Sequence, residues 1–534
     1  MSKEKIFIFD TTLRDGAQTE GVDFSVEDKN KIAKVLSEVG VDYIEGGWPG
    51  ANPIDTEFFS KPISLGKSIF TAFGMTKKTG RSAENDPSLS PLINASCPAV
   101  CVVGKAWDFH VKIALGINNK DNLENIKDTA KHIVKNGKEF LFDAEHFFDG
   151  YKSNPNYALD CLKYAFDQGA RWLVLCDTNG GTLPHEVGEI VSKVTKVIPG
   201  KNLGIHAHND TENAVANSLT AIQAGVRQVQ GTINGLGERC GNANLMSVIP
   251  TLSLKKTFSD KYDLNIHKNK LSTLTECSRL LDEILNRKPN KNLPYVGASA
   301  FSHKGGLHVS AVQKDPKTYE HVDPKLIGNH RNIIVSNQAG RSNILSRLEN
   351  YGVKIDSKDP KVQKILDEVK EREFSGYSYD GADASFELLA NRLLGKVPEY
   401  LKVESYNVNV SKSDRILTKA NVVFLIDKKK IECNGEGNGP VNALDNAIRS
   451  NFKKVEKYYN FFSDLKLLDY KVRILNTGTE ATTRVLIEST DKTGVSWFTV
   501  GVSPNIIEAS FKALIDSLDY KLYKEKAPAN LNEK

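Results

Sequence analysis

The sequence has no run of about 20 apolar residues, the length that a transmembrane helix requires. Its first residues, Met-Ser-Lys-Glu-Lys, lead directly into an apolar run and lack the hydrophobic region and cleavage site of a signal peptide. No basic stripe alternates with aromatic residues, and 71 basic and 66 acidic residues leave a net charge of only +5. We therefore expect a cytoplasmic protein that binds neither a membrane nor nucleic acid.

Cysteine is also scarce, and none of the seven residues forms a Cys-x-x-Cys pair. They are Cys97, Cys101, Cys161, Cys176, Cys240, Cys277 and Cys433. Most lie in apolar surroundings, which is typical of small buried side chains with free thiols in a reducing compartment. The pattern argues against a disulfide framework.

The composition, 40% hydrophobic and 26% charged, is ordinary for a globular protein. A chain of 534 residues is too long for a single compact core, so we expect two or three domains. In residues 1–270, short apolar runs alternate with amphipathic helical patterns, such as the one that opens at Ser25 with a capping-box spacing and ends at Gly40. Eight runs are typical of strands: Lys5–Asp10, Val41–Glu45, Ile69–Phe73, Ala99–Val103, Phe140–Asp143, Trp172–Cys176, Leu203–His206 and Val229–Ile233. Eight strand–helix units in about 250 residues predict an α/β fold, a (β/α)8 TIM barrel. An open doubly wound sheet is the alternative, but the glycine fingerprint that favours it is missing after Asp10.

Beyond the barrel, the pattern changes twice. Residues 271–395 are predicted to form helical connecting subdomains, with helices at Val362–Glu373 and Ala384–Leu394. Residues 396–534 are predicted to form an α+β domain with strands at Tyr406–Val410, Lys419–Ile426, Lys471–Leu475, Thr482–Glu488 and Ser496–Val502. Gly437-Asn-Gly-Pro440 and Gly501-Val-Ser-Pro504 each precede a helical run, which predicts an internal pseudo-repeat. The two turns either bind an anionic ligand or are tight turns without one.

Catalytic residues of a barrel lie at the carboxyl ends of its strands, and five polar clusters follow predicted strands. They are Arg14–Asp15, Glu145–His146, Asp177–Asn179, His206–Asp210 and Gly235–Asn242. His206 and His208 are two residues apart on a strand, so their rings face the same side, as two ligands of one metal would. Ordinary buried histidines are the alternative.

An Asp carboxylate and an Asn carbonyl from other strand ends would complete a mixed nitrogen and oxygen set with open positions. Such a set predicts a catalytic divalent metal site for Mg, Mn, Co or Zn. No thiolate belongs to it, although Cys240 lies nearby, so we do not expect a closed structural zinc site. Arg14 beside a metal-binding Asp15 suits a 2-oxo acid substrate, whose carboxylate or carbonyl the guanidinium would bind. An Arg–Asp pair taken alone is more often a surface ion pair.

Three motifs in this order resemble the 2-isopropylmalate/homocitrate/citramalate synthase family, and the likeness covers nearly the whole chain. The motifs are Asp10-Thr-Thr-Leu-Arg-Asp-Gly16, His206-Ala-His-Asn-Asp210 and Gly237-Glu-Arg-Cys-Gly-Asn242. Three further segments are similar to the (R)-citramalate synthase branch: Val41–Pro49, Asp143–Gly150 and Leu175–Pro184. The resemblance implies that the substrates are acetyl-CoA and pyruvate, that the products are (R)-citramalate and CoA, and that the reaction belongs to isoleucine biosynthesis.

The same resemblance implies roles for individual residues. Asp15, His206, His208 and Asn242 correspond to metal ligands, with Mn²⁺ or Mg²⁺ expected first and Zn²⁺ or Co²⁺ as alternatives. Arg14 and Thr178 correspond to the residues that hold the oxo acid. Glu145, His308 and Tyr319 correspond to catalytic residues, with His303 as the rival of His308. Because relatives supply this His and Tyr from the partner subunit, a homodimer with exchanged segments is expected.

The resemblance also predicts that residues 396–534 form a regulatory domain that senses an end product, with isoleucine as the leading effector. Other acceptors of the acetyl unit remain open, namely 2-oxoisovalerate, as in 2-isopropylmalate synthase, and 2-oxoglutarate. A carbon–carbon lyase is a further alternative, which the long C-terminal region disfavours. A non-catalytic amino-acid sensor is disfavoured by the intact Arg, Asp, His and Asn set.

Overall fold

The computed structural model describes residues 3–531 except 288, 334–340, 351–352, 354, 357, 380, 413–415, 455 and 476–480. They form two compact units, Met1–Phe301 with His321–Arg331, and Ser302–Glu320 with Asn332–Lys534. The division into three domains at residues 270 and 395 stays a prediction. Among the described helices, none combines the length and the apolarity that a membrane span needs.

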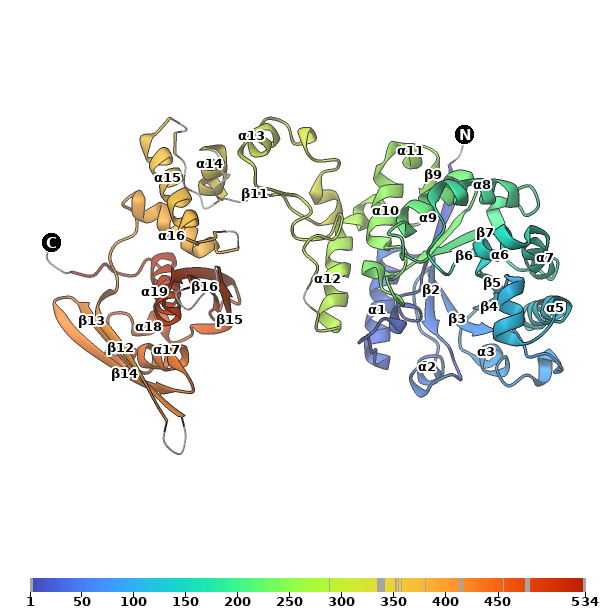
Figure 1. Cartoon of the computed structure of the whole chain (residues 1–534), viewed down its shortest axis with the longest axis horizontal. Helices are drawn as coiled ribbons and strands as arrows, with labels where there is room; N and C mark the ends of the chain where they lie inside the picture. Colours follow the sequence, from blue (N-terminus) through green and yellow to red (C-terminus); the bar gives the residue numbers. More distant parts are fainter. Residues whose placement is uncertain are drawn as a thin grey trace. The chain divides into compact units, whose positions relative to one another are not determined.

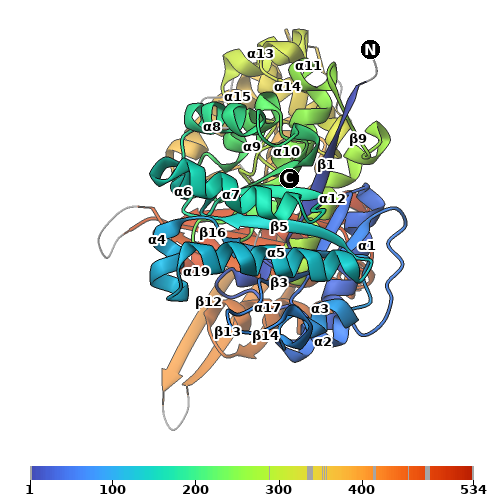
Figure 2. The ribbon, with the colours of Figure 1, turned by 90° about the vertical axis from the view of Figure 1, so that its right-hand side faces the viewer.

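The first unit is the predicted barrel, with eight parallel strands closed by pairing of β1 with both β2 and β8. The strands are β1 (Glu4–Asp10), β2 (Tyr43–Gly47), β3 (Ile69–Met75), β4 (Ala99–Lys105), β5 (Glu139–Glu145), β6 (Trp172–Asp177), β7 (Leu203–Ala207) and β8 (Gln228–Gly231). The helices that follow them are α1 (Val26–Val39), α2 (Pro53–Phe58), α3 (Ser90–Asn94), α5 (Asn119–Lys135), α7 (Pro155–Phe166), α8 (Pro184–Val194), α9 (Ala214–Ala224) and α10 (Leu245–Leu254). Figures 1 and 2 show these helices around the outside of the strands. A ninth parallel strand, β9 (Tyr262–Leu264), pairs with β1 and was not expected.

Side chains alternate along each strand between the barrel interior and the surrounding helices. On β1, Ile8 belongs to the core shared with the helices, whereas Phe9 packs with the interior residues Tyr43 and Trp172. The indole nitrogen of Trp172 donates to the hydroxyl of Tyr43, 3.1 Å away. The interior is therefore filled, and only the residues near the carboxyl ends of the strands can face a substrate.

The second unit contains the predicted repeat. The antiparallel strands β12 (Lys402–Lys412), β13 (Ile416–Ile426) and β14 (Lys429–Gly437) are followed by α17 (Pro440–Asn451). The strands β15 (Lys466–Ile474), β16 (Thr483–Thr490) and β17 (Ser496–Ser503) are followed by α19 (Ile506–Lys524). Pro440 lies in the first turn of α17 as expected, whereas Pro504 lies outside α19, which begins after Asn505.

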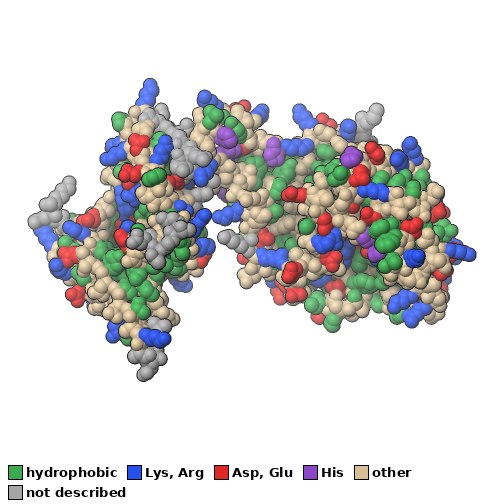
Figure 3. All heavy atoms as spheres, viewed as in Figure 1, with side chains coloured by type: hydrophobic (Ala, Val, Ile, Leu, Met, Phe, Trp, Pro, Cys, Tyr) green, Lys and Arg blue, Asp and Glu red, His purple; other side chains and the backbone are tan. Residues whose placement is uncertain are grey.

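The connecting helices are α12 (Leu274–Ile284), α13 (Gly306–Lys314), α14 (Arg341–Asn350), α15 (Pro360–Phe374) and α16 (Asp383–Leu393). The helices expected at 362–373 and 384–394 are therefore present as α15 and α16. All seven cysteines are free, but Cys240 is exposed and so departs from the expected burial. On the face drawn in Figure 3, basic and acidic side chains are interspersed.

Candidate active site

A cavity of about 190 Å³ opens among the carboxyl ends of the barrel strands. Its lining consists of Arg14, Asp15, Gln18, Phe73, Val103, Asp143, Glu145, Cys176, Thr178, His206, His208, Glu238 and Arg239. Six of the nine predicted site residues are in this set. Asn242 is not part of the lining, but its side chain is hydrogen-bonded to Asp15. His308 and Tyr319 belong to the second unit.

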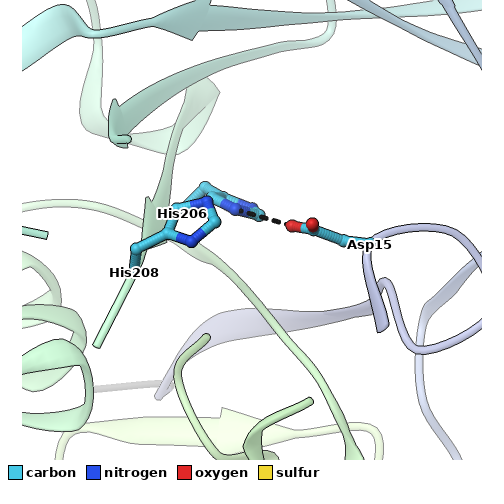
Figure 4. Close-up of side chains that lie close together, drawn as sticks. All are labelled: Asp15, His206 and His208. Carbon is cyan, nitrogen blue, oxygen red and sulfur yellow. Dashed lines mark ion pairs between the residues drawn. The ribbon is translucent and has the colours of Figure 1, made fainter. Parts of the chain in front are cut away.

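Asp15, His206 and His208 each offer a ligand atom, and these atoms lie within 4.8 Å of one another. Figure 4 shows Asp15 approaching from the loop after β1 while both rings come from the end of β7. Nε2 of His206 lies 3.1 Å from Oδ2 of Asp15, and the two ring centroids are 5.2 Å apart. The expected orientation of the two histidines toward one point is therefore present.

Asn242 joins this group through its backbone and its side chain. It forms an isolated antiparallel bridge with His208, and its Nδ2 donates to Oδ2 of Asp15 at 2.8 Å. Its Oδ1 and the Nδ1 of His208 are buried without a hydrogen-bond partner among the described residues. Because buried polar atoms are rarely left unpaired, these two atoms fit a site that holds a cation.

Burial and neighbouring charges together shift the pKa values of these three residues. Burial would raise the pKa of Asp15, but Arg14 and His206 hold it well below its usual value. Burial would lower the pKa of His206, but Asp15 outweighs this effect and raises it. Burial, helped by the charge on His206, lowers the pKa of His208 to about 3. His208 is therefore neutral near pH 7 and keeps a lone pair for a ligand bond.

Arg14 is fixed at the edge of the cavity from three sides. Its Nε donates to Oε2 of Glu45 at 2.6 Å, and one terminal nitrogen lies 3.6 Å from Oδ1 of Asp15. Its guanidinium carbon lies 4.0 Å from the ring centroid of Phe73. Burial alone would lower the pKa of Arg14, but the carboxylates of Glu45, Asp15 and Asp143 raise it, so a permanent cation lines the cavity.

Glu145 is the last residue of β5 and forms an ion pair with Lys105, the last residue of β4. The following residue, His146, has a left-handed backbone with φ of 56°, which is uncommon for a residue other than glycine. The backbone N–H of His146 donates to the hydroxyl oxygen of Thr178 at 2.9 Å. Glu145 and Thr178 are thereby held on adjacent strand ends beside the cavity.

A buried lysine connects the loop that carries Arg14 to the end of β2, the strand that carries Glu45. Nζ of Lys29, on α1, donates to the carbonyl oxygens of Leu13 at 2.9 Å and Gly46 at 2.8 Å. It also forms an ion pair with Asp55 on α2. Desolvation lowers the pKa of Lys29, although Asp55 opposes this effect.

In the second unit, the rings of His308 and Tyr319 stack with centroids 4.1 Å apart, and Tyr319 is 44% exposed. His303 is buried instead, with Nε2 3.2 Å from Oε1 of Glu320. The exposed pair at His308 and Tyr319 is accordingly better suited than His303 to face a ligand.

Several residues of the site were not predicted from the sequence: the inner residues Glu45, Asp143 and Gln230, and also Lys105 and Lys29. Glu45 and Asp143 lie within predicted barrel strands, where a charged residue facing inward is itself a signal. Lys29 carries no such signal, because its helix also contains the lysines Lys31 and Lys34.

Comparisons with known proteins cover both units. The HMGL-like family model matches residues 5–280, the homocitrate synthase post-HMGL domain-like model 295–375, and the LeuA allosteric (dimerisation) domain model 380–522. An (R)-citramalate synthase of Aquifex aeolicus is 50% identical over 98% of this chain and 98% of its own length. That of Geobacter sulfurreducens is 50% identical over 97% of each chain. A probable 2-isopropylmalate synthase of Methanopyrus kandleri is 30% identical over 96% of this chain and 97% of its own length.

The fold and the site define an HMGL-like barrel enzyme with a candidate metal centre at the carboxyl ends of its strands. Within this class, the chain is 50% identical to two (R)-citramalate synthases along nearly its whole length. The chain belongs to the (R)-citramalate synthase family.

Proposed function

We propose that this chain condenses acetyl-CoA with pyruvate to give (R)-citramalate and CoA. The methyl group of acetyl-CoA loses a proton, its carbon bonds to the keto carbon of pyruvate, and the new alkoxide takes up a proton. Water then cleaves the thioester and releases free CoA and a carboxylate. The observation that carries the proposal is the 50% identity to (R)-citramalate synthases over both units, together with the intact cavity.

The residues present fit a divalent metal ion. Asp15, His206 and His208 would hold it, and the unpaired Oδ1 of Asn242 would complete the set. A bound divalent ion supplies Lewis-acid polarisation of the keto group. Mn²⁺ or Mg²⁺ is proposed first, with Zn²⁺ or Co²⁺ as alternatives.

Arg14 and Thr178 would orient the oxo acid. The cationic Arg14, pinned by Glu45 and Phe73, offers charge-assisted hydrogen bonds to the carboxylate or to the developing alkoxide. The hydroxyl of Thr178 accepts from His146, so its own hydrogen remains to donate to the substrate carboxylate.

Glu145 lines the cavity and, together with His308 and Tyr319, is proposed to form or orient the base that takes the methyl proton. In this proposal a partner subunit supplies His308 and Tyr319, whose exposure suits such an exchange. The match of residues 380–522 to a dimerisation domain supports a homodimer.

The decisive measurement is free-thiol release from acetyl-CoA with a panel of 2-oxo acids, with and without a chelator. Pyruvate should be the best acceptor, and the chelator should stop the release. Thiol release that survives complete removal of metal would contradict the metal centre, whereas a preference for another acid would contradict only the choice of acceptor.

The second candidate acceptor is 2-oxoisovalerate, because the probable 2-isopropylmalate synthase of Methanopyrus kandleri is also similar over 96% of this chain. Additional methyl groups are worth only about 1–3 kcal/mol of discrimination in an apolar pocket. The lower identity of that relative, 30% against the 50% of the Aquifex aeolicus (R)-citramalate synthase, supports pyruvate.

The match to an allosteric domain supports end-product regulation, for which isoleucine is proposed as the effector. Thiol release by the full chain should fall as isoleucine is added and respond less to leucine. A rate unaffected by either amino acid would contradict this part of the proposal.

A further inference from the structure

His206 is held by a buried side chain on the opposite side of its ring from Asp15. Its Nδ1 lies 2.8 Å from Oε1 of Gln230 on the neighbouring strand β8. Nε2 of Gln230 in turn donates to Oδ1 of Asp143 on β5, 3.1 Å away. Gln230 is completely buried and Asp143 is 3% exposed. A hydrogen-bonded chain therefore crosses the barrel interior from β5 to β8 to β7.

The chemistry of these groups determines which atom donates and which accepts in each of the two hydrogen bonds. A carboxylate accepts hydrogen bonds, so Asp143 receives the amide nitrogen of Gln230 and leaves the carbonyl oxygen toward His206. A carbonyl oxygen also only accepts, so the ring must carry a hydrogen on Nδ1 to complete the bond. Nε2, which faces Asp15, is then the ring nitrogen free to bind a cation.

We propose that Gln230 is a positioning residue of the metal centre, which sets the ring orientation and the hydrogen position of His206 through its bond to Asp143. The inference rests on the proposed function, because it assumes that Asp15 and His206 bind a divalent ion. Loss of such a supporting hydrogen bond typically weakens metal binding about 10- to 100-fold.

The same strand supplies a matched control. Gln228 lies two residues earlier on β8, so its side chain faces the same side of the strand. It is also completely buried, and both polar atoms of its amide lack a hydrogen-bond partner among the described residues. Gln228 therefore shares residue type, strand and burial with Gln230 but makes no bond to a histidine.

The test is calorimetric titration of the metal-stripped full chain with Mn²⁺. Gln230→Met, which preserves volume but not the hydrogen bonds, should raise the Kd about 10- to 100-fold. Gln228→Met should leave the Kd unchanged. Equal Kd values for Gln230→Met and the unchanged chain would overturn the inference, as would equal weakening by both variants. If the unchanged chain bound no Mn²⁺, Zn²⁺ or Co²⁺, the proposed metal centre itself would fall and the inference with it.

A conservative variant separates hydrogen bonding from packing. Gln230→Glu keeps an acceptor opposite Nδ1 of His206 but loses the donor to Asp143, whereas Gln230→Met loses both. We expect the Glu variant to bind Mn²⁺ more tightly than the Met variant, with both showing an unchanged far-ultraviolet circular dichroism spectrum. Binding by the Met variant as tight as by the Glu variant would show that Gln230 only fills space.

Discussion

The rim of the barrel and the repeat of the second unit are positioned by different physical means. At the rim, Arg14 and His206 are held by hydrogen bonds to the buried side chains of Glu45 and Gln230. In the repeat, each helix approaches its sheet so closely that only glycine fits. A Cβ on Gly435 would lie 2.2 Å from the backbone of α17, and one on Gly501 would lie 2.0 Å from that of α19.

This difference predicts that metal binding and folding stability can be changed independently of each other. Changing one polar group at the rim should alter metal binding while the barrel, filled by apolar side chains, stays folded. Changing a glycine of the repeat should destabilise the second unit without altering the metal centre. Four experiments test this separation, from the largest expected effect to the smallest.

His208→Ala should abolish measurable metal binding and lower turnover by roughly 10³-fold, because several kcal/mol of charge stabilisation is lost with the ion. The unfolding midpoint should change little, because His208 lies beside a cavity. Calorimetric titration with Mn²⁺ and thiol release measure the two effects. His185→Ala, at an exposed histidine of α8, is the control and should match the unchanged chain. Full turnover by the His208 variant would remove this residue from the metal centre.

Lys29→Met should be the exception among changes near the rim, because it should lower the free energy of unfolding. It leaves the carboxylate of Asp55, which is 7% exposed, without its cation, and losing one partner of a buried pair costs about 3–5 kcal/mol. Urea unfolding should show the loss. Lys31→Met, on the same helix but with an exposed ion pair to Glu27, should leave the midpoint unchanged. Equal midpoints for the two variants would show that Lys29 is not a structural clamp.

Gly501→Ala should destabilise the second unit by about 1–3 kcal/mol, because the added methyl group forces β17 and α19 apart. The Kd for Mn²⁺ should not change. Gly439→Ala is the matched control, since a Cβ there meets no atom within 4 Å. Weakened metal binding by the Gly501 variant would mean that the two units are energetically coupled.

The affinity for metal should fall as the pH is lowered from 8 to 6. Burial would lower the pKa of His206, but Asp15 raises it above its ordinary value, so protons compete with metal for this ring near neutral pH. His208, with a pKa of about 3, should not compete in this range. Titrations in buffers of different ionisation enthalpy should detect about one proton released per metal bound. Affinity that rises on acidification would contradict the assignment.

Much of the fold was predictable, because the eight barrel strands are apolar runs of standard length. Among the described strands, β9 and β14 were not predicted, and neither were the two-residue strands β10 (Ser302–His303) and β11 (Asn332–Ile333). The short β9 exists only through its pairing with β1. In β14, the side that packs on α17 carries Ile431, Cys433 and two glycines, Gly435 and Gly437, so it has few large apolar residues; the glycines allow the close approach of α17.

The site was predictable to a similar extent. Arg14, Asp15, Glu145, Thr178, His206 and His208 line one cavity because a parallel barrel brings all strand ends to the same rim. Their roles, and those of Asn242, His308 and Tyr319, stay predictions until the variants are measured. The supporting bonds from Glu45 and Gln230 were missed, because their partners Arg14 and His206 lie 31 and 24 residues away, beyond the range of any local spacing pattern.

By itself, the sequence determined the barrel and the polar rim, since periodic apolar runs and polar residues at their ends follow from local spacing. Only the tertiary structure decided which of two residues of the same type, close together in the sequence, has a partner in the interior. Gln228 and Gln230 share a strand face, and Lys29 and Lys31 share a helix, yet only one of each pair meets a partner in the interior. Those partners, Asp143 and Asp55, lie 87 and 26 residues away, and no local pattern records a contact made through space.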